Sequence, residues 1–212
     1  MNRNPKKNNI PEYIMIEGKV ISDQTTIANK FNEYFVNVGP TMAQKIQIPK
    51  DKSFESYLNN PAKQPFEFKV VEKETVLKVI DSLKPNSSYG HDKMSNNLLK
   101  FVKHELANAL KLLINQSIEH AVFPDILKVA KIKPIHKKDD NKYLKNYRPI
   151  SILPSVSKVF EKIIYNQMYE HFVENKLFYT SQYGFRKLHS TEHALIEIVD
   201  RIINEMDKNR FL

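Results

Sequence analysis

The chain has 212 residues, 41% of them apolar and 27% charged, which is typical of a folded protein and excludes a disordered one. The net charge of +9 favours an acidic partner, either nucleic acid or an anionic membrane surface. Nucleic acid is the preferred partner, because the sequence shows no signal peptide and no apolar run of the about 18 residues that span a bilayer. The lack of cysteine excludes disulfides and thiolate metal sites, so we expect an intracellular protein of the nucleus or cytoplasm, not a secreted one.

The first part of the chain predicts one helix between two irregular segments. Residues 1–21 open with an Asn- and Lys-rich stretch, and we expect a flexible lead-in. Within residues 22–66, a helix is predicted after a cap at Ser22 or Asp23, and Gly39-Pro40 should close it. The prolines that follow predict a linker with one short helix near Phe54–Leu58.

Residues 67–125 have the apolar spacing of helices. One helix is predicted from about Glu72 to Leu83, ending before Pro85. After a loop over residues 84–93, a long helix is predicted from about Ser95 to His120. Apolar residues expected in the core are Val76, Leu77, Ile80, Leu83, Leu99, Val102, Leu106, Leu110 and Leu113.

At the start of residues 126–212 the spacing of apolar residues changes from a helical pattern to short β-branched segments. The β-branched segments Ile126–Ile135 and Ile150–Leu153 predict two antiparallel strands, in which Pro134 and Pro149 need edge or strand-end positions because each lacks a donor. Five of the nine net positive charges lie in residues 131–148, at the tip of this hairpin. A stiff cationic finger suits a nucleic-acid backbone or a nucleotide triphosphate, and a solvated basic loop is the alternative.

Two further helices complete the prediction. One starts near Ser155, and the other starts near Ser190 or Thr191 after a loop that contains residues 181–187. The last helix is expected to bury an apolar face that comprises Leu195, Ile198, Val199, Ile202 and Met206. The fold class is therefore α+β, mainly helical with a small antiparallel β-hairpin.

No metal or cofactor site is predicted. Asp139-Asp140 is the only Asp-Asp pair, and its place at the tip of a charged hairpin favours a solvated turn. His189 and His193 have the spacing of a helical zinc pair, but the sequence places no third ligand beside them.

Several segments in order resemble the first fingers blocks of non-LTR retrotransposon reverse transcriptases, nearest to the jockey-like and CR1-like branches. These blocks are Lys133–Lys138, Asn146–Leu153, Ser157–Lys162 and Gln182–Leu195, and Phe31–Gly39, Lys84–Asp92 and Leu98–Lys100 resemble the segment before them. The resemblance covers residues 22–212. It implies that residues 126–212 are the fingers of a right-hand polymerase fold, after a helical pre-fingers segment and without palm or thumb.

The resemblance also implies roles for individual residues. Two residues are expected to bind the phosphates of the incoming nucleotide. They are Arg148 and the fingertip lysine, which is Lys137, or Lys138 if the register slips by one. Contacts to template and primer are expected from Lys131, Lys133, Gln182, Gly184, Phe185 and Arg186, with Tyr183 in place of the usual Phe. Phe185 is either a stacking platform for a base or a core residue.

The sequence departs from the family in two places. Gly90-His-Asp-Lys93 stands where many relatives read Gly-Pro-Asp-Gly, so its turn is expected to differ. The strand with the first metal-binding Asp is expected only after residue 212, and the Tyr-Ala-Asp-Asp block further on. We therefore predict no catalytic residue in this chain, no activity of the chain alone, and Mg²⁺ only for the full-length family enzyme.

Three functions are compatible with these features. The first is a fragment of an RNA-directed DNA polymerase that holds an RNA template and a DNA primer. The second is a non-catalytic nucleic-acid-binding module derived from such an element, and the third is a helical interaction protein. Salt-dependent binding to a primer–template separates the first two from the third.

Overall fold

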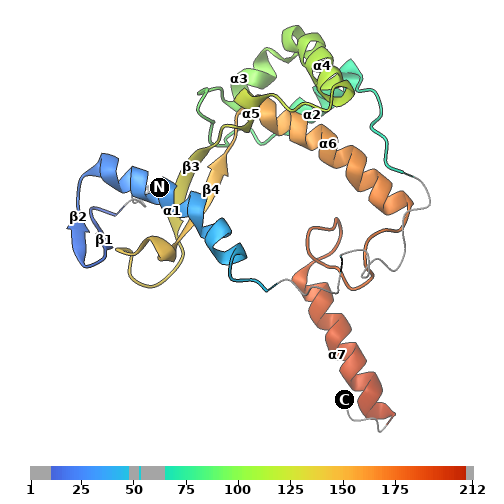
Figure 1. Cartoon of the computed structure of the whole chain (residues 1–212). Helices are drawn as coiled ribbons and strands as arrows, with labels where there is room; N and C mark the ends of the chain where they lie inside the picture. Colours follow the sequence, from blue (N-terminus) through green and yellow to red (C-terminus); the bar gives the residue numbers. More distant parts are fainter. Residues whose placement is uncertain (1–10, 48–52, 54–64, 209–212) are drawn as a thin grey trace, which may run out of the picture. The chain divides into compact units, whose positions relative to one another are not determined.

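The computed structural model describes residues 11–47, 53 and 65–208 (Figure 1). They divide into two compact units: residues 11–47, 53 and 68–166 form the first, and residues 65–67 and 167–208 form the second. The structure is mainly helical with two small antiparallel sheets, as expected for the α+β class. No helix in the described ranges is long and apolar enough to cross a membrane.

The first unit opens with a β-hairpin where we expected a flexible lead-in. Strands β1 (Ile14–Ile16) and β2 (Lys19–Ile21) are antiparallel, and Ile14 is fully buried. Glu17 and Gly18 connect them with φ of 50° and 77°, as a tight I′-type turn requires. The lead-in prediction is therefore wrong for residues 14–21. Glu17-Gly18 between two short apolar segments is the signal that could have revealed the hairpin.

Helix α1 (Gln24–Ala43) begins where one of the two predicted caps lies. The Asp23 carboxylate accepts hydrogen bonds from the Thr26 N–H at 2.7 Å and the Thr26 hydroxyl at 2.6 Å. The predicted end at Gly39-Pro40 is wrong, because proline removes its own donor but its carbonyl still accepts from the Gln44 N–H at 3.0 Å. The predicted short helix near residues 54–58 lies outside the described residues.

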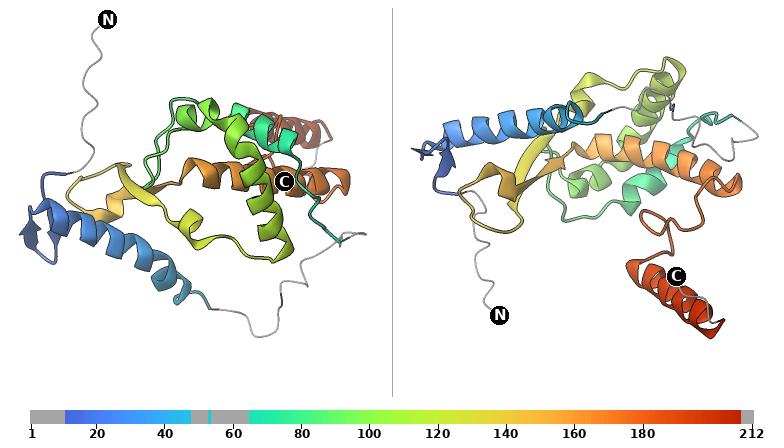
Figure 2. Two further views of the ribbon diagram at one scale, coloured as in Figure 1. Left: turned by 90° about the horizontal axis from the view of Figure 1, so that it is seen from above. Right: turned by 60° about the horizontal axis from the view of Figure 1, so that its bottom comes forward.

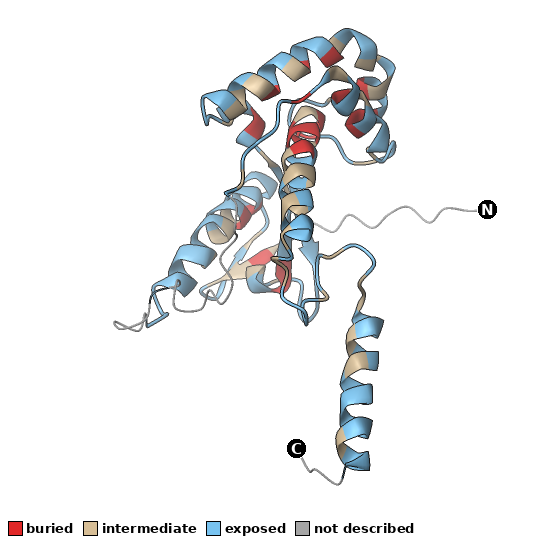
Figure 3. Ribbon diagram, turned by 90° about the vertical axis from the view of Figure 1, so that its right-hand side faces the viewer, coloured by how far each residue is buried: buried red, intermediate tan, exposed pale blue. Residues whose placement is uncertain are grey.

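A helical core occupies the rest of the first unit. It is formed by α2 (Lys73–Ser82), α3 (Asn96–Phe101), α4 (Lys103–Glu119) and the start of α6 (Ser155–Glu174), where the buried segments in Figure 3 gather. Its buried residues include Val71, Val76, Ile80, Leu99, Ala107, Leu110, Ile114, Val159, Phe160 and Ile163. Helix α2 confirms its prediction to within one residue at each end.

The single helix predicted from Ser95 to His120 is two helices. Ser95 caps the first as predicted, accepting from the Leu98 N–H at 3.1 Å. Val102 interrupts the run with φ −99° and ψ 17°, outside the helical region. In the second helix Ile114 is buried, whereas Leu113, a predicted core residue, is 36% exposed.

The basic hairpin is formed by strands β3 (Lys131–His136) and β4 (Tyr147–Ile152), which pair antiparallel as predicted. The predicted strand start at Ile126 is wrong, because Asp125–Lys128 form a helical turn, α5, that follows Pro124. Short apolar runs do not distinguish helix from strand by period alone.

The two prolines of the hairpin lie directly opposite each other. Pro134 pairs with Pro149. Three positions further along the ladder, the Lys137 N–H donates to the Asn146 carbonyl at 2.9 Å, so those two residues form a hydrogen-bonded pair. Hydrogen-bonded and non-hydrogen-bonded pairs alternate in an antiparallel ladder, so the prolines occupy a non-bonded pair. Their missing donors therefore cost the hairpin no ladder bond, which agrees with the edge positions expected for them.

A second, smaller core holds the tip of this hairpin against α1 and the N-terminal hairpin (Figures 1 and 2). The rings of Phe31 and Tyr147 meet edge to face with centroids 4.8 Å apart. The Met15 N–H donates to the Lys142 carbonyl at 2.9 Å, which joins β1 to the fingertip loop. Ile14 and Ile27 complete the buried set.

The second unit contains the end of α6, the loop that follows it, and α7 (Thr191–Asp207). Ser190 caps α7 by accepting from the His193 N–H at 3.3 Å, at one of the two predicted positions. The predicted burial of its apolar face is wrong: none of its residues is buried (Figure 3), and Leu195, Ile198, Val199, Ile202 and Met206 are 39–67% exposed. Helical spacing predicts an apolar face, but the described part of this unit offers no second helix of comparable length to cover it.

Candidate nucleic-acid interface

Three predicted cationic residues share one face of the basic hairpin. Lys131 and Lys133 lie two positions apart on β3, and Arg148 lies on β4 opposite Ile135. Paired residues in an antiparallel ladder project to the same side, and side chains alternate along each strand. Lys131, Lys133 and Arg148 therefore form one cationic face, whereas Tyr147 projects to the opposite side, into the small core.

The cationic face is not neutralised by acidic neighbours. Lys131, Lys133 and Arg148 are exposed, and none of them forms an ion pair within the ranges that the structure describes. The isoleucines between them, Ile135 and Ile150, are 36% and 43% exposed. This surface combines open positive charge with apolar patches, a combination that suits phosphates beside sugar or base.

The predicted fingertip lysines follow directly on β3. The Lys137 N–H extends the ladder by one bond to the Asn146 carbonyl, so the alternation of the strand assigns its side chain to the cationic face. Lys138 is the next residue of the loop. Both are exposed, and neither forms an ion pair in the described structure.

Hydrogen bonds fix the fingertip loop that carries these lysines. Asn146 Nδ2 donates to the Asp140 carbonyl at 2.7 Å, and the Tyr147 hydroxyl donates to the Asn141 carbonyl at 2.7 Å. Burial, with a smaller effect from the Asp140 carboxylate, raises the pKa of Tyr147, so this phenol remains a donor at neutral pH. His136 Nε2 lies 2.9 Å from the Asp139 carbonyl oxygen. Sequence reasoning did not assign a role to Asn146 or Tyr147, although both stand in the conspicuous Asn-Tyr-Arg-Pro block.

Neither candidate metal pair is built as a metal site. Asp140 Oδ1 accepts from the Lys142 N–H at 3.0 Å, and Asp139 has a positive φ of 61°, so the two residues form a turn. His189 Nδ1 lies 2.9 Å from the Lys187 carbonyl oxygen. Among the described residues, no three His, Asp or Glu side chains gather where they could hold an ion.

The remaining predicted residues lie on the loop before α7, in the second unit. Phe185 is 99% exposed with a positive φ of 62°, so its ring lies outside the core of the described residues. Arg186 Nη1 donates to the carbonyls of Tyr179 at 3.3 Å and Gln182 at 3.2 Å. Its guanidinium also lies over the Phe178 ring, which shows that Arg186 helps to shape the loop. Gln182 Nε2 donates to the Gly184 carbonyl at 3.3 Å.

Comparisons with known proteins relate the chain to RNA-directed DNA polymerases. Residues 135–212, from the end of β3 onward, match the family of reverse transcriptases, described as RNA-dependent DNA polymerases. A probable RNA-directed DNA polymerase from transposon BS of Drosophila melanogaster is 30% identical over 155 residues, which cover 73% of this chain and 17% of that protein.

Two further relatives come from the same organism. The RNA-directed DNA polymerase from mobile element jockey is 27% identical over 161 residues, 76% of this chain and 18% of the relative. The probable RNA-directed DNA polymerase from transposon X-element is 31% identical over 137 residues, 64% of this chain and 15% of the relative. The chain thus spans less than a fifth of the length of these curated relatives.

Proposed function

Because this chain belongs to the reverse transcriptases of non-LTR retrotransposons, we propose that it forms the fingers region of an RNA-directed DNA polymerase. In this proposal it contacts the template–primer and the phosphates of the incoming nucleotide. The observation that carries the proposal is the cationic face. Lys131, Lys133 and Arg148 are exposed on one side of a hairpin, and Tyr147 on the other side anchors it in the smaller core.

The chemistry of nucleotidyl transfer explains why such a face is useful. A polymerase must hold a triphosphate in line with a primer end and must neutralise the charge that develops on it. Lysine supplies a mobile point charge, and arginine supplies a planar fork that can grip two phosphate oxygens. In our proposal Lys137, Lys138 and Arg148 contact the nucleotide, while Lys131, Lys133, Gln182, Gly184, Phe185 and Arg186 contact the strands.

Replacing Arg148 with alanine tests this proposal. We expect the chain to bind a labelled deoxynucleoside triphosphate about tenfold more weakly, because the fork that grips two phosphate oxygens is lost, and the salt slope of primer–template binding to stay unchanged. The free energy of unfolding should change by less than about 0.5 kcal/mol, because the exposed guanidinium has no ion-pair partner in the described structure. Fluorescence anisotropy and a thermal melt measure the two effects. A large loss of stability would instead make Arg148 a structural residue.

The purified 212-residue chain is expected to show no primer extension with Mg²⁺. The reason is that the described residues contain no cluster of three acidic or histidine side chains that could hold the ions. Extension of a labelled primer on an RNA template, with a complete relative as positive control, measures this activity. Nucleotide incorporation that persists through purification would contradict the proposed absence of catalytic carboxylates. Binding without extension is also what the second candidate predicts, namely a non-catalytic module derived from such an element.

A further inference from the structure

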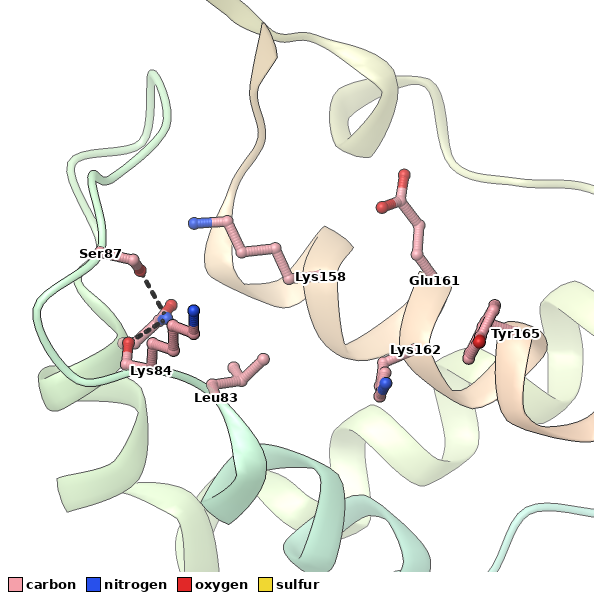
Figure 4. Close-up of a pocket in the computed structure, with 8 residues that line it drawn as sticks. Leu83, Lys84, Ser87, Lys158, Glu161, Lys162 and Tyr165 are labelled. Atoms are coloured by element: carbon pink, nitrogen blue, oxygen red, sulfur yellow. Dashed lines mark hydrogen bonds between the residues drawn. The ribbon is translucent and has the colours of Figure 1, made fainter. Parts of the chain in front are cut away.

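A second cationic site lies in the first unit, away from the residues assigned to the hairpin. A pocket of about 440 Å³ is lined by the end of α2, the turn that follows it, the start of α3 and one face of α6 (Figure 4). Its lining residues are Leu83, Lys84, Ser87, Asn96, Lys158, Glu161, Lys162 and Tyr165. The α6 residues recur at the three- and four-residue spacing that places side chains on one side of a helix.

A buried asparagine fixes the polar end of this pocket. Asn96 is only 2% exposed, and its Nδ2 donates to the Lys84 carbonyl at 2.8 Å and to Ser87 Oγ at 2.6 Å. Its Oδ1 lies 2.7 Å from the hydroxyl of Ser155, which is fully buried. Since Ser87 Oγ accepts from Asn96, its own proton is left to donate to a ligand.

Positive charge exceeds negative charge in the pocket. Lys158 Nζ donates to the Ser88 carbonyl at 3.0 Å, a bond that leaves its charge uncompensated, and Lys162 lies over the Tyr165 ring at 4.9 Å. Neither lysine, nor Lys84, forms an ion pair with a carboxylate in the parts of the chain that the structure describes. Glu161 and Lys162 point in different directions in Figure 4. Burial raises the pKa of Glu161, which is consistent with a carboxylate that no cation holds.

We propose that this pocket binds a phosphate group of a single-stranded nucleic acid between Lys84, Ser87 and Lys158. The neighbouring base would lie toward Tyr165, which is 39% exposed. A hydroxyl donor between two ammonium groups matches a phosphate, and an aromatic ring beside it can reach a base only where the strand is unpaired. This inference goes beyond the proposed function, because it uses none of the hairpin residues.

The test uses a labelled single-stranded RNA and the full chain. The double variant Lys84→Gln/Lys158→Gln is expected to bind about tenfold more weakly, with a salt slope lower by about 0.7 for each lysine. Ser87→Ala should weaken binding about fivefold with an unchanged slope, because it removes a hydrogen-bond donor and no charge. A thermal melt checks that the chain still folds without this acceptor for Asn96 Nδ2. Glu161→Gln should strengthen binding, since it removes the only carboxylate of the lining. Lys78→Gln, on an exposed position of α2 outside the pocket, is the matched control.

Two outcomes would overturn the inference. One is that the pocket variants bind the RNA as the Lys78→Gln control does. The other is that they weaken binding of a free deoxynucleoside triphosphate and leave RNA binding unchanged, which would assign the phosphate to a nucleotide. The same measurements on the Arg148→Ala chain separate the two proposals. If the pocket acts independently of the hairpin, the pocket substitutions weaken RNA binding by the same factor in the Arg148→Ala chain as in the wild type.

Discussion

Replacing Lys131, Lys133, Lys137 and Lys138 together with glutamine is expected to weaken primer–template binding about a hundredfold or more at low salt. All four side chains are exposed, and none has an ion-pair partner in the described structure, so their charge is available to phosphates. The loss of Lys131 and Lys133, the two proposed strand contacts among the four, should reduce the slope of log K against log salt by about 1.8, whereas the loss of Lys137 and Lys138 should weaken nucleotide binding. Glutamine keeps most of the side-chain stem, so the fold should persist, and circular dichroism can verify this.

A variant of equal charge distinguishes the hairpin from net charge alone. Four lysines elsewhere, Lys19, Lys78, Lys93 and Lys176, are also exposed and also lack an ion pair in the described ranges. Their joint replacement with glutamine removes the same charge and should change the slope much less, because long-range attraction is screened within about 10 Å at 0.1 M salt. Equal losses in the two variants would show that the cationic face is not the binding surface.

The basic hairpin could be predicted from the sequence because its determinants are local. Two β-branched segments flank a cationic loop, and a period of two decides which side chains share a face once the register is known. The residues that brace it could not be predicted in the same way. Phe31 and Tyr147 are far apart in the sequence, and only the folded chain shows that their rings meet.

Local signals in the sequence predict where helices form, but not how far they continue or what covers them. Apolar periodicity gives the face of a helix but neither its continuity nor its partner. Val102 interrupts a run that reads as one helix, Pro40 lies within a helix it was expected to end, and α7 presents an apolar face that is not buried. The pocket beside α6 was also missed, because the roles of Asn96 and Ser87 depend on hydrogen bonds to loop carbonyls and to Ser155.

Gly90→Ala is expected to have the largest effect on stability, about 3 kcal/mol, or roughly 10 °C in Tm. A Cβ at Gly90 would lie 2.6 Å from the Pro154 nitrogen and 2.9 Å from both the Leu153 carbonyl carbon and Pro154 Cα. These are backbone atoms, so no side-chain rotation can relieve the overlap. Close packing against this backbone therefore requires a glycine at position 90.

Gly39→Ala is the matched control for this substitution. A Cβ at Gly39 would meet nothing within 4 Å, and the position lies inside α1, so alanine should be neutral or stabilise the chain by about 0.5–1 kcal/mol. Leu153 and Pro154 connect β4 to α6, and the loop with Gly90 also carries Ser87 and Ser88. Alanine at Gly90 should therefore disturb the hairpin and the α6 pocket together, and weaken both binding activities. A Gly90→Ala chain that melts and binds like the wild type would show that the loop does not dock on this junction.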